Sequence, residues 1–207
     1  MSYHDVAHGV GWLAVVLTVW GSLAQFRHIV GRGATGVSLS TWTIFSYMSC
    51  FWASYGVEQR SAIIVLGSAL VFPFQVGVVW HLKPWRSWDV VAYATSFSIL
   101  VCLVATLAWG WSAGVFGAGV AMVLTRGPQI VGLVRHPDAS GVSVSMWVLS
   151  GCALGCWMIY YQNSDLWAAF TSVSCAALAS VVIILLASWR HRQAHEAVLL
   201  STDVAVA

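Results

Sequence analysis

The chain has 207 residues, of which 59% are hydrophobic and only 8% are charged, and its formal net charge is +2. Soluble domains usually carry about a quarter charged residues, so this composition excludes an ordinary soluble domain. The small net charge gives no indication of nucleic-acid binding. We therefore predict an all-α integral membrane protein whose main partner is the lipid bilayer.

The elements are predicted from uncharged stretches, because a helix needs about 20 residues to span the hydrocarbon. In chain order these stretches are 6–26, 33–57, 61–82, 90–125, 139–164 and 166–189. The fourth is too long for one helix, and we predict two, at about 88–108 and 111–133, with a break near Gly110. This makes seven transmembrane helices. The first lacks a basic leader and a cleavage site, so we expect it to be retained rather than removed as a signal peptide.

The basic residues predict the orientation of the chain in the membrane. With the N-terminus outside, eight of the nine Lys and Arg residues fall on one side, and Arg60 is the exception. The positive-inside rule makes that side, and the C-terminus, cytoplasmic. We expect the membrane to be a bacterial inner membrane.

The first three helices are repeated in the last three. In one register Gln25 is paired with Gln129, and Ser22 with Arg126; after one inserted residue Trp52 is paired with Trp157, and Tyr55 with Tyr160. The charge placement makes the repeats parallel, so one extra helix must invert the chain between them. We predict a first triple-helix repeat at 9–82, a linker helix at 88–108, a second repeat at 111–189 and a cytoplasmic tail at 190–207.

Turns and prolines refine these helices. The segments 33–36 and 136–141 are turn sequences, and each leads into a Ser-x-Ser in which a serine suits the N-cap of the next helix. Pro73 and Pro128 fall inside predicted spans, where proline removes a backbone hydrogen bond and bends the helix. The bends are either static kinks or hinges for alternating access.

The string Gly127-Pro128-Gln129 is followed by a polar loop, by residues 141–145 and by Trp157-x-x-Tyr160. This part of the sequence resembles the PQ-loop superfamily. The 3+1+3 layout is similar to its SWEET branch of sugar facilitators, which have the single-repeat SemiSWEETs as relatives. The resemblance implies that Trp52 and Trp157 flank a sugar. It also implies a substrate-binding asparagine in the third helix of each repeat, and we assign Ser68 and Ser172 to these positions. A second departure is Ala24 in place of the first repeat's proline, so we expect the first helix to bend less than the fifth.

Four further residues are candidates for a gate or hinge. Tyr55 and Tyr160 lie one turn beyond the tryptophan pair and suit either an outer gate or an interfacial aromatic belt. Gln25 and Gln129 lie towards the inner ends of their helices, where a buried amide needs partners. They suit cross-bracing of the bundle with some hinge role, or an inner gate.

The absence of Asp and Glu at mid-membrane depth in the repeats narrows the mechanism. Proton relays in membranes commonly use buried carboxylates, so we predict uniport of a small neutral polar solute, with a sugar as first choice. The alternatives are a proton-linked amino-acid or organic-acid carrier of the PQ-loop type, or a receptor or assembly protein on the same fold.

We expect no enzyme activity, because neither paired aspartates, nor a Ser–His arrangement, nor a His-Glu-x-x-His motif falls at membrane depth. The single lysine, Lys83, lies in a loop, which argues against a retinal Schiff base. We also expect no cofactor and no metal, and we leave a homo-oligomer open.

Overall fold

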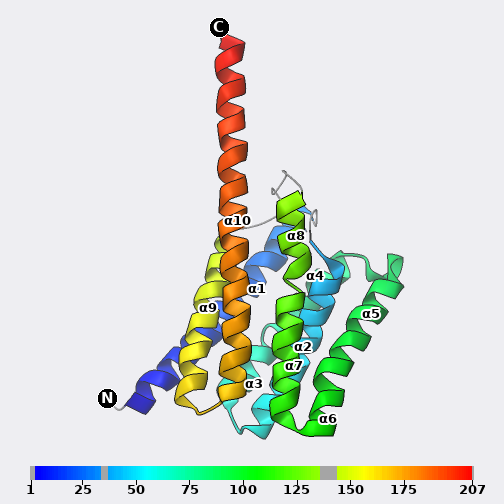
Figure 1. Ribbon diagram of the computed structural model, residues 1–207, viewed down its shortest axis with the longest axis vertical. Coiled ribbons are helices and arrows are strands. Elements are labelled where there is room, and N and C mark those ends of the chain that lie inside the picture. Colours follow the sequence, from blue (N-terminus) through cyan, green and yellow to red (C-terminus); the bar gives the residue numbers. More distant parts are fainter. Residues whose placement is uncertain (1–2, 34–36, 136–143, 207) are drawn as a thin grey trace.

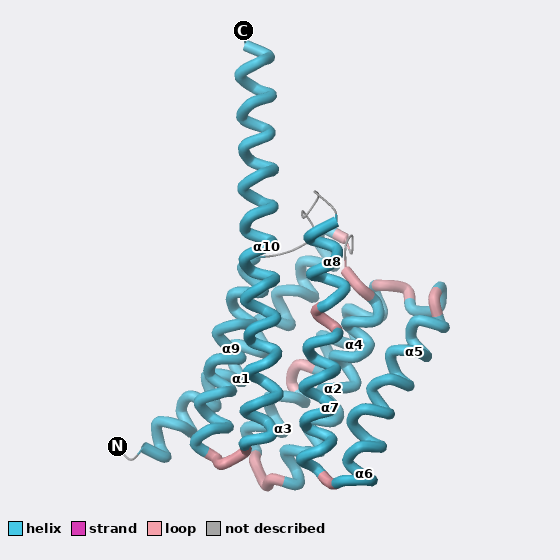
Figure 2. Tube along the Cα trace, in the orientation of Figure 1, coloured by secondary structure: helices cyan, strands magenta, loops and turns pink. Residues whose placement is uncertain are grey.

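The computed structural model describes residues 3–33, 37–135 and 144–206. Its regular elements, in chain order, are α1 (Tyr3–Arg32), α2 (Leu39–Glu58), α3 (Ala62–Ala69), α4 (Phe72–His81), η1 (Pro84–Arg86), α5 (Trp88–Ser98), η2 (Ile99–Val104), α6 (Ala105–Trp109), α7 (Trp111–Leu124), α8 (Gly127–Arg135), α9 (Val144–Asn163) and α10 (Trp167–Val206). All of these described elements are helical, as predicted, and short loops join most of them (Figure 2).

Within the described residues, five helical segments are long and apolar enough to cross a membrane. They are Asp5–Gly31, Ala62–His81, Trp88–Trp109, Val144–Asn163 and Trp167–Gln193. The helix Trp111–Leu124 is apolar but shorter. The helix α2 has the necessary length, 20 residues, but it carries many hydroxyl side chains. The prediction of an all-α membrane protein is confirmed, and the count of seven spans stays a prediction.

Two of the helical rods are interrupted, and in each case a proline follows the interruption. Pro73 lies in the first turn of α4, just after the break that separates it from α3, and Pro128 lies in the first turn of α8, just after the break from α7. Proline suits a first turn because the missing N–H has no partner there in any case. By contrast α1, which carries Ala24 at the corresponding position, runs without interruption. The first helix is therefore uninterrupted where the fifth is broken, and the smaller bend expected of it stays a prediction.

Glycine ends the linker segment and allows it to pack closely. Gly110 has a φ of +87°, which favours glycine, and it separates α6 from α7 at the predicted break. Seven residues further along, a side chain at Gly117 would overlap the backbone carbonyl of Val101 in η2. The linker and α7 are therefore in direct backbone contact.

The packing of the helices follows a regular pattern. The pair α3 and α4 contacts both α1 and α2, and in the same way α10 contacts both α7 and α9. Between these two groups, α1 packs along α9 on one side. On the other side the segment formed by α5, η2 and α6 contacts α2 and α7 (Figure 1). One three-helix group thus consists of α1, α2 and the α3–α4 pair, and the other consists of α7, α9 and α10. The two groups face each other.

The helix ends bear out part of the expected capping. Ser38 accepts a hydrogen bond from the Thr41 backbone N–H and caps α2, whereas the corresponding turn at 136–141 lies outside the described residues, as does 34–36. At the C-terminus, α10 continues to Val206 and extends well beyond the other helices (Figure 1). The expected tail at 190–207 is therefore largely a continuation of the last helix, since it is rich in helix-forming Ala, Leu, Gln and Glu.

Candidate functional site

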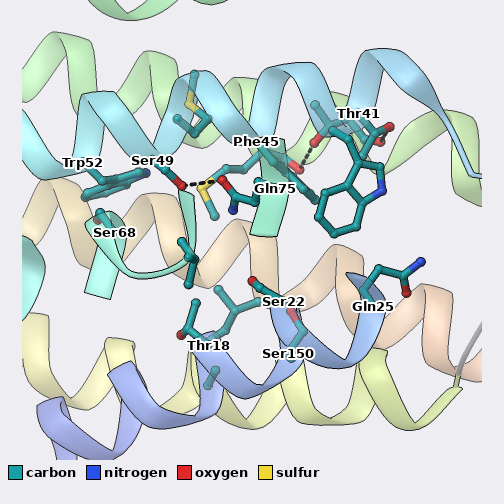
Figure 3. Close-up of a pocket in the computed structure, with 18 of the residues that line it drawn as sticks. Thr18, Ser22, Gln25, Thr41, Phe45, Ser49, Trp52, Ser68, Gln75 and Ser150 are labelled. Atoms are coloured by element: carbon teal, nitrogen blue, oxygen red, sulfur yellow. Dashed lines mark hydrogen bonds between the residues drawn. The ribbon is translucent and has the colours of Figure 1, made fainter. Parts of the chain in front are cut away.

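A cavity of about 220 Å³ lies between the two three-helix groups. Figure 3 shows Thr18, Ser22 and Gln25 of α1 on one side of it and residues of α2 on the opposite side. Besides apolar and aromatic side chains, its lining includes hydroxyl and amide groups from several helices: Thr18, Ser22, Gln25, Ser38, Thr41, Ser49, Ser68, Gln75, Thr125 and Ser150. The volume is below the roughly 300–1,000 Å³ of drug-sized pockets, so the cavity suits a small polar molecule.

Trp52 and Trp157, paired by the repeat, both line this cavity and are buried, each 8% exposed. They share one partner, Tyr161. Its ring is stacked on Trp52 at a centroid distance of 5.9 Å and on Trp157 at 5.4 Å, with interplanar angles of 19° and 20°. The resemblance implies that a sugar lies beside the two indoles. In this structure the side chain of Tyr161 occupies part of that space.

The orientation of Trp157 is fixed from two directions. Its indole Nε1 donates a hydrogen bond of 3.1 Å to Thr18 Oγ1, and Thr18 in turn donates to the Ala14 carbonyl in α1. Its six-membered ring lies against Gly67 in α3, where an added Cβ would come within 2.8 Å of the ring. Trp157 of α9 thus links α1 and α3 at the wall of the cavity.

Tyr55 and Tyr160 lie beyond the two tryptophans, towards the turn between α2 and α3. Both are 4% exposed, and neither lines the cavity. Tyr55 packs against Trp52 and Trp111. The hydroxyl of Tyr160 forms a 2.8 Å hydrogen bond with Ser61, the N-cap of α3, and so joins the two helix groups. We call Trp52, Tyr55, Trp157, Tyr160 and Tyr161 the aromatic layer; it covers one end of the cavity.

The two serines expected to replace the substrate-binding asparagines lie in different surroundings. Ser68 lines the cavity. Ser172 is not one of the lining residues, and its hydroxyl donates a 2.7 Å hydrogen bond to the Val115 carbonyl, which joins α10 to α7. The register that pairs Trp52 with Trp157 in fact pairs Ser68 with Val173, and Val173 does line the cavity.

The candidate hinge residues are placed in part. Gln25 is 4% exposed and lines the cavity, near the end opposite to Trp52 and Ser68 in Figure 3. The backbone of Pro128 and Gln129 lies in the first turn of α8, while their side chains are outside the described part of the structure. Thr41 of α2 contacts the break between α7 and α8, because its hydroxyl donates a 3.1 Å hydrogen bond to the Thr125 carbonyl.

Most lining residues were not among the sequence candidates, and two of them stand out, namely Tyr161 and Arg126. In the register of the repeat, Tyr161 is paired with Gly56 and Arg126 with Ser22. Both are positions at which the two halves differ sharply in size or charge. Because they are mismatched, the similarity of the two halves does not mark them, and the only signal in the sequence is the contrast in size or charge itself.

Comparison with known proteins gives one partial match. A stretch of 46 residues, 22% of this chain, is 35% identical to the sugar transporter SemiSWEET of Vibrio sp. (strain N418) and covers 47% of that protein. The match thus spans about half the length of this relative. No protein-family model and no solved structure matches the chain. Together with the apolar helices, the match indicates an integral membrane protein with partial similarity to SemiSWEET transporters.

Proposed function

We propose that this protein is a membrane transporter that lets a small hydroxylated solute, a sugar in the first instance, diffuse across the bilayer through the central cavity. The observation that carries the proposal is the cavity itself, which lies between two helix groups and is rich in hydroxyl and amide groups. Such groups exchange hydrogen bonds with a polyol as water does. The partial similarity to a sugar transporter supports the same solute class.

The proposed architecture is 3+1+3, with seven spans, two parallel three-helix repeats at 9–82 and 111–189, and an inverting linker at 88–108. The packing pattern supports it, because the third rod of each proposed repeat contacts the other two. Aromatic side chains cover the cavity at the end nearer the α2–α3 turn, whereas Ser38, at the start of α2, lines the cavity itself. We therefore propose that the cavity opens towards the side of the α1–α2 loop, which the basic residues make cytoplasmic.

The proposed mechanism is uniport. The lining residues that the structure describes include no Asp, Glu or His, and carboxylates are the usual proton carriers within membranes. Alternating access would then involve parting of the aromatic layer, in which the Tyr160–Ser61 hydrogen bond joins the two helix groups.

Flux in proteoliposomes tests the proposal. Labelled monosaccharides should equilibrate without a proton gradient, and Trp157→Ala should lose most of this flux, because the indole lines the cavity. Trp20→Ala is the matched control, since Trp20 is 60% exposed on the outer face of α1 and its loss should leave flux unchanged. A panel of mono- and disaccharides with no flux above empty liposomes would overturn the sugar proposal and favour a receptor role. A strict requirement for a pH gradient would favour the proton-linked carrier.

A further inference from the structure

A single charged side chain lines the cavity among the residues that the structure describes, and it is Arg126. It lies at the break between α7 and α8 and is only 3% exposed. Arginine stays protonated in proteins, and a buried charge is costly unless it is paired. A charged residue within a membrane protein is for this reason a candidate functional site by default.

The partners of Arg126 fix its position without neutralising its charge. Nε donates a 3.0 Å hydrogen bond to Ser180 Oγ in α10, and Nη1 donates to the Met122 carbonyl in α7. The guanidinium carbon lies 5.8 Å from the ring centroid of Phe45 in α2 and 5.9 Å from that of Trp147 in α9. Both rings attract a cation but carry no net charge.

Among the residues that the structure describes, these bonds leave one edge of the guanidinium without a hydrogen-bond partner. Between described residues, they engage Nε and Nη1, whereas the planar group carries five N–H donors in a fork. None of the described lining residues is acidic. The guanidinium is thus held on one edge by the protein, and its other edge borders the cavity. With a free edge of this kind, arginine binds a carboxylate or phosphate through paired hydrogen bonds.

The charge at this position is present in only one of the two proposed repeats. The register of the proposed repeats pairs Arg126 with Ser22 of α1, which also lines the cavity. The first half of the protein therefore carries an uncharged residue at the corresponding position. The cation is specific to one wall of the cavity, which points to recognition of a ligand with a charge at one end.

Resting on the proposed transport function, we propose that Arg126 forms an anion subsite and that the transported solute is a small hydroxylated monocarboxylate, a sugar acid. One carboxylate balances one guanidinium, whereas a phosphate dianion would leave a second charge buried. The rest of the molecule would meet the hydroxyl groups of Thr18, Ser22 and Ser150, which line the same cavity. This changes the expectation of a neutral solute to that of a singly charged anion.

Flux of glucuronate and of glucose in proteoliposomes tests the subsite. The wild-type protein should transport glucuronate faster than glucose, and glucuronate should compete with glucose. Arg126→Gln should lower glucuronate flux by roughly 10–100-fold, which corresponds to one hydrogen bond to a charged group, and should leave a residual glucose flux. Arg126→Lys should retain part of the glucuronate flux, because it keeps the charge but loses the fork. Arg86→Gln, on an exposed loop arginine, is the charge-loss control.

The membrane potential gives a second readout. Glucuronate moving alone carries one negative charge, so an imposed inside-positive potential should concentrate it in the liposomes and leave the distribution of glucose unchanged. Glucuronate uptake that ignores the potential would overturn uniport of the anion.

The two proposals fail in different ways. If the wild-type protein transports glucose but neither transports glucuronate nor is inhibited by it, the anion subsite is overturned and sugar transport stands. If neither solute moves, the transport proposal fails, and calorimetric titration of the detergent-solubilised protein with glucuronate decides the subsite. Binding that is weakened in Arg126→Gln would support it, and absence of binding to the wild type would overturn it. If Arg126→Gln does not fold, the wild-type competition and titration experiments still decide.

Discussion

At the scale of single residues, the cavity wall depends on a glycine and a tryptophan that touch. The ring of Trp157 lies directly over Gly67, where an added methyl group would come within 2.8 Å of Cζ2. The hydrogen bond from Nε1 to Thr18 holds the indole from the other side. If the ring moves away from Gly67, the hydrogen bond to Thr18 is therefore lost.

We expect Gly67→Ala to displace Trp157 and to impair transport while most of the fold is kept. Overpacking of this kind typically costs about 1–3 kcal/mol, and misplacement of a binding group by about 1 Å can lower activity by roughly 100-fold. Labelled-solute flux and thermal unfolding in detergent measure the two effects. Gly155→Ala is the control, because Gly155 lies on the same helix as Trp157 and no atom lies within 4 Å of its added Cβ. Equal effects of the two substitutions would contradict the argument.

At the scale of elements, Ser61 has two roles at the start of α3. Its hydroxyl accepts the Ile64 backbone N–H as an N-cap, and it also bonds to the hydroxyl of Tyr160 in α9. The cap makes α3 begin at this point of the chain, and the second bond ties that beginning to the opposite helix group.

A double-mutant cycle with Ser61→Ala and Tyr160→Phe should reveal this second role. Each substitution should destabilise the protein, and the coupling free energy should be about 0.6 kcal/mol and at most about 1.7 kcal/mol, the range measured for hydrogen bonds between membrane helices. Reversible unfolding in mixed micelles provides the measurement. Ser54→Ala is the matched serine control, since Ser54 is exposed and bonds only to the Cys50 carbonyl of its own helix in the described contacts. Zero coupling would mean that the two helix groups are not joined here.

At the scale of the whole molecule, the conformation described here should open the cavity to one side of the membrane, so that this side reaches it more readily than the other. In a variant without native cysteines, Ser150→Cys lies in the cavity, and Arg60→Cys lies in the exposed α2–α3 turn. A membrane-impermeant maleimide should label position 150 from the cytoplasmic side and position 60 from the opposite side. Inside-out and right-side-out vesicles distinguish the two cases. Labelling of both positions from the same side would overturn the proposed orientation of the cavity.

Much of this architecture could be predicted because it follows from backbone rules that act locally. Proline removes a backbone hydrogen-bond donor, so a disturbance of the helices near Pro73 and Pro128 could be predicted, and the break at Gly110 could be predicted because it falls in an uncharged stretch that is too long for one helix. The burial of Trp52 and Trp157 beside one cavity followed from their pairing in the repeat. These features need no knowledge of side-chain contacts across the bundle.

The contents of the cavity could not be predicted in the same way. Ser172 is one residue out of the register that pairs Trp52 with Trp157: its hydroxyl bonds to the Val115 carbonyl in α7, and Val173, the residue in register with Ser68, lines the cavity. Arg126 falls towards the inner end of the predicted helix 111–133, but the sequence does not show which way its side chain points, and in the structure it lines the cavity. Tyr161 looked like an ordinary aromatic residue until its two stacking partners, from different helices, were seen together.

The joining of both helix groups in one chain has a consequence for how such a protein can evolve. In a symmetric dimer of half-length chains, every residue appears twice around the axis, so an arginine at this depth would bring a second one and their charges would repel each other. A continuous chain with a linker, here α5 to α6, removes that restriction. Each half can then change alone, and in the predicted repeat the pairs Ser22 with Arg126 and Gly56 with Tyr161 are positions at which the two halves differ.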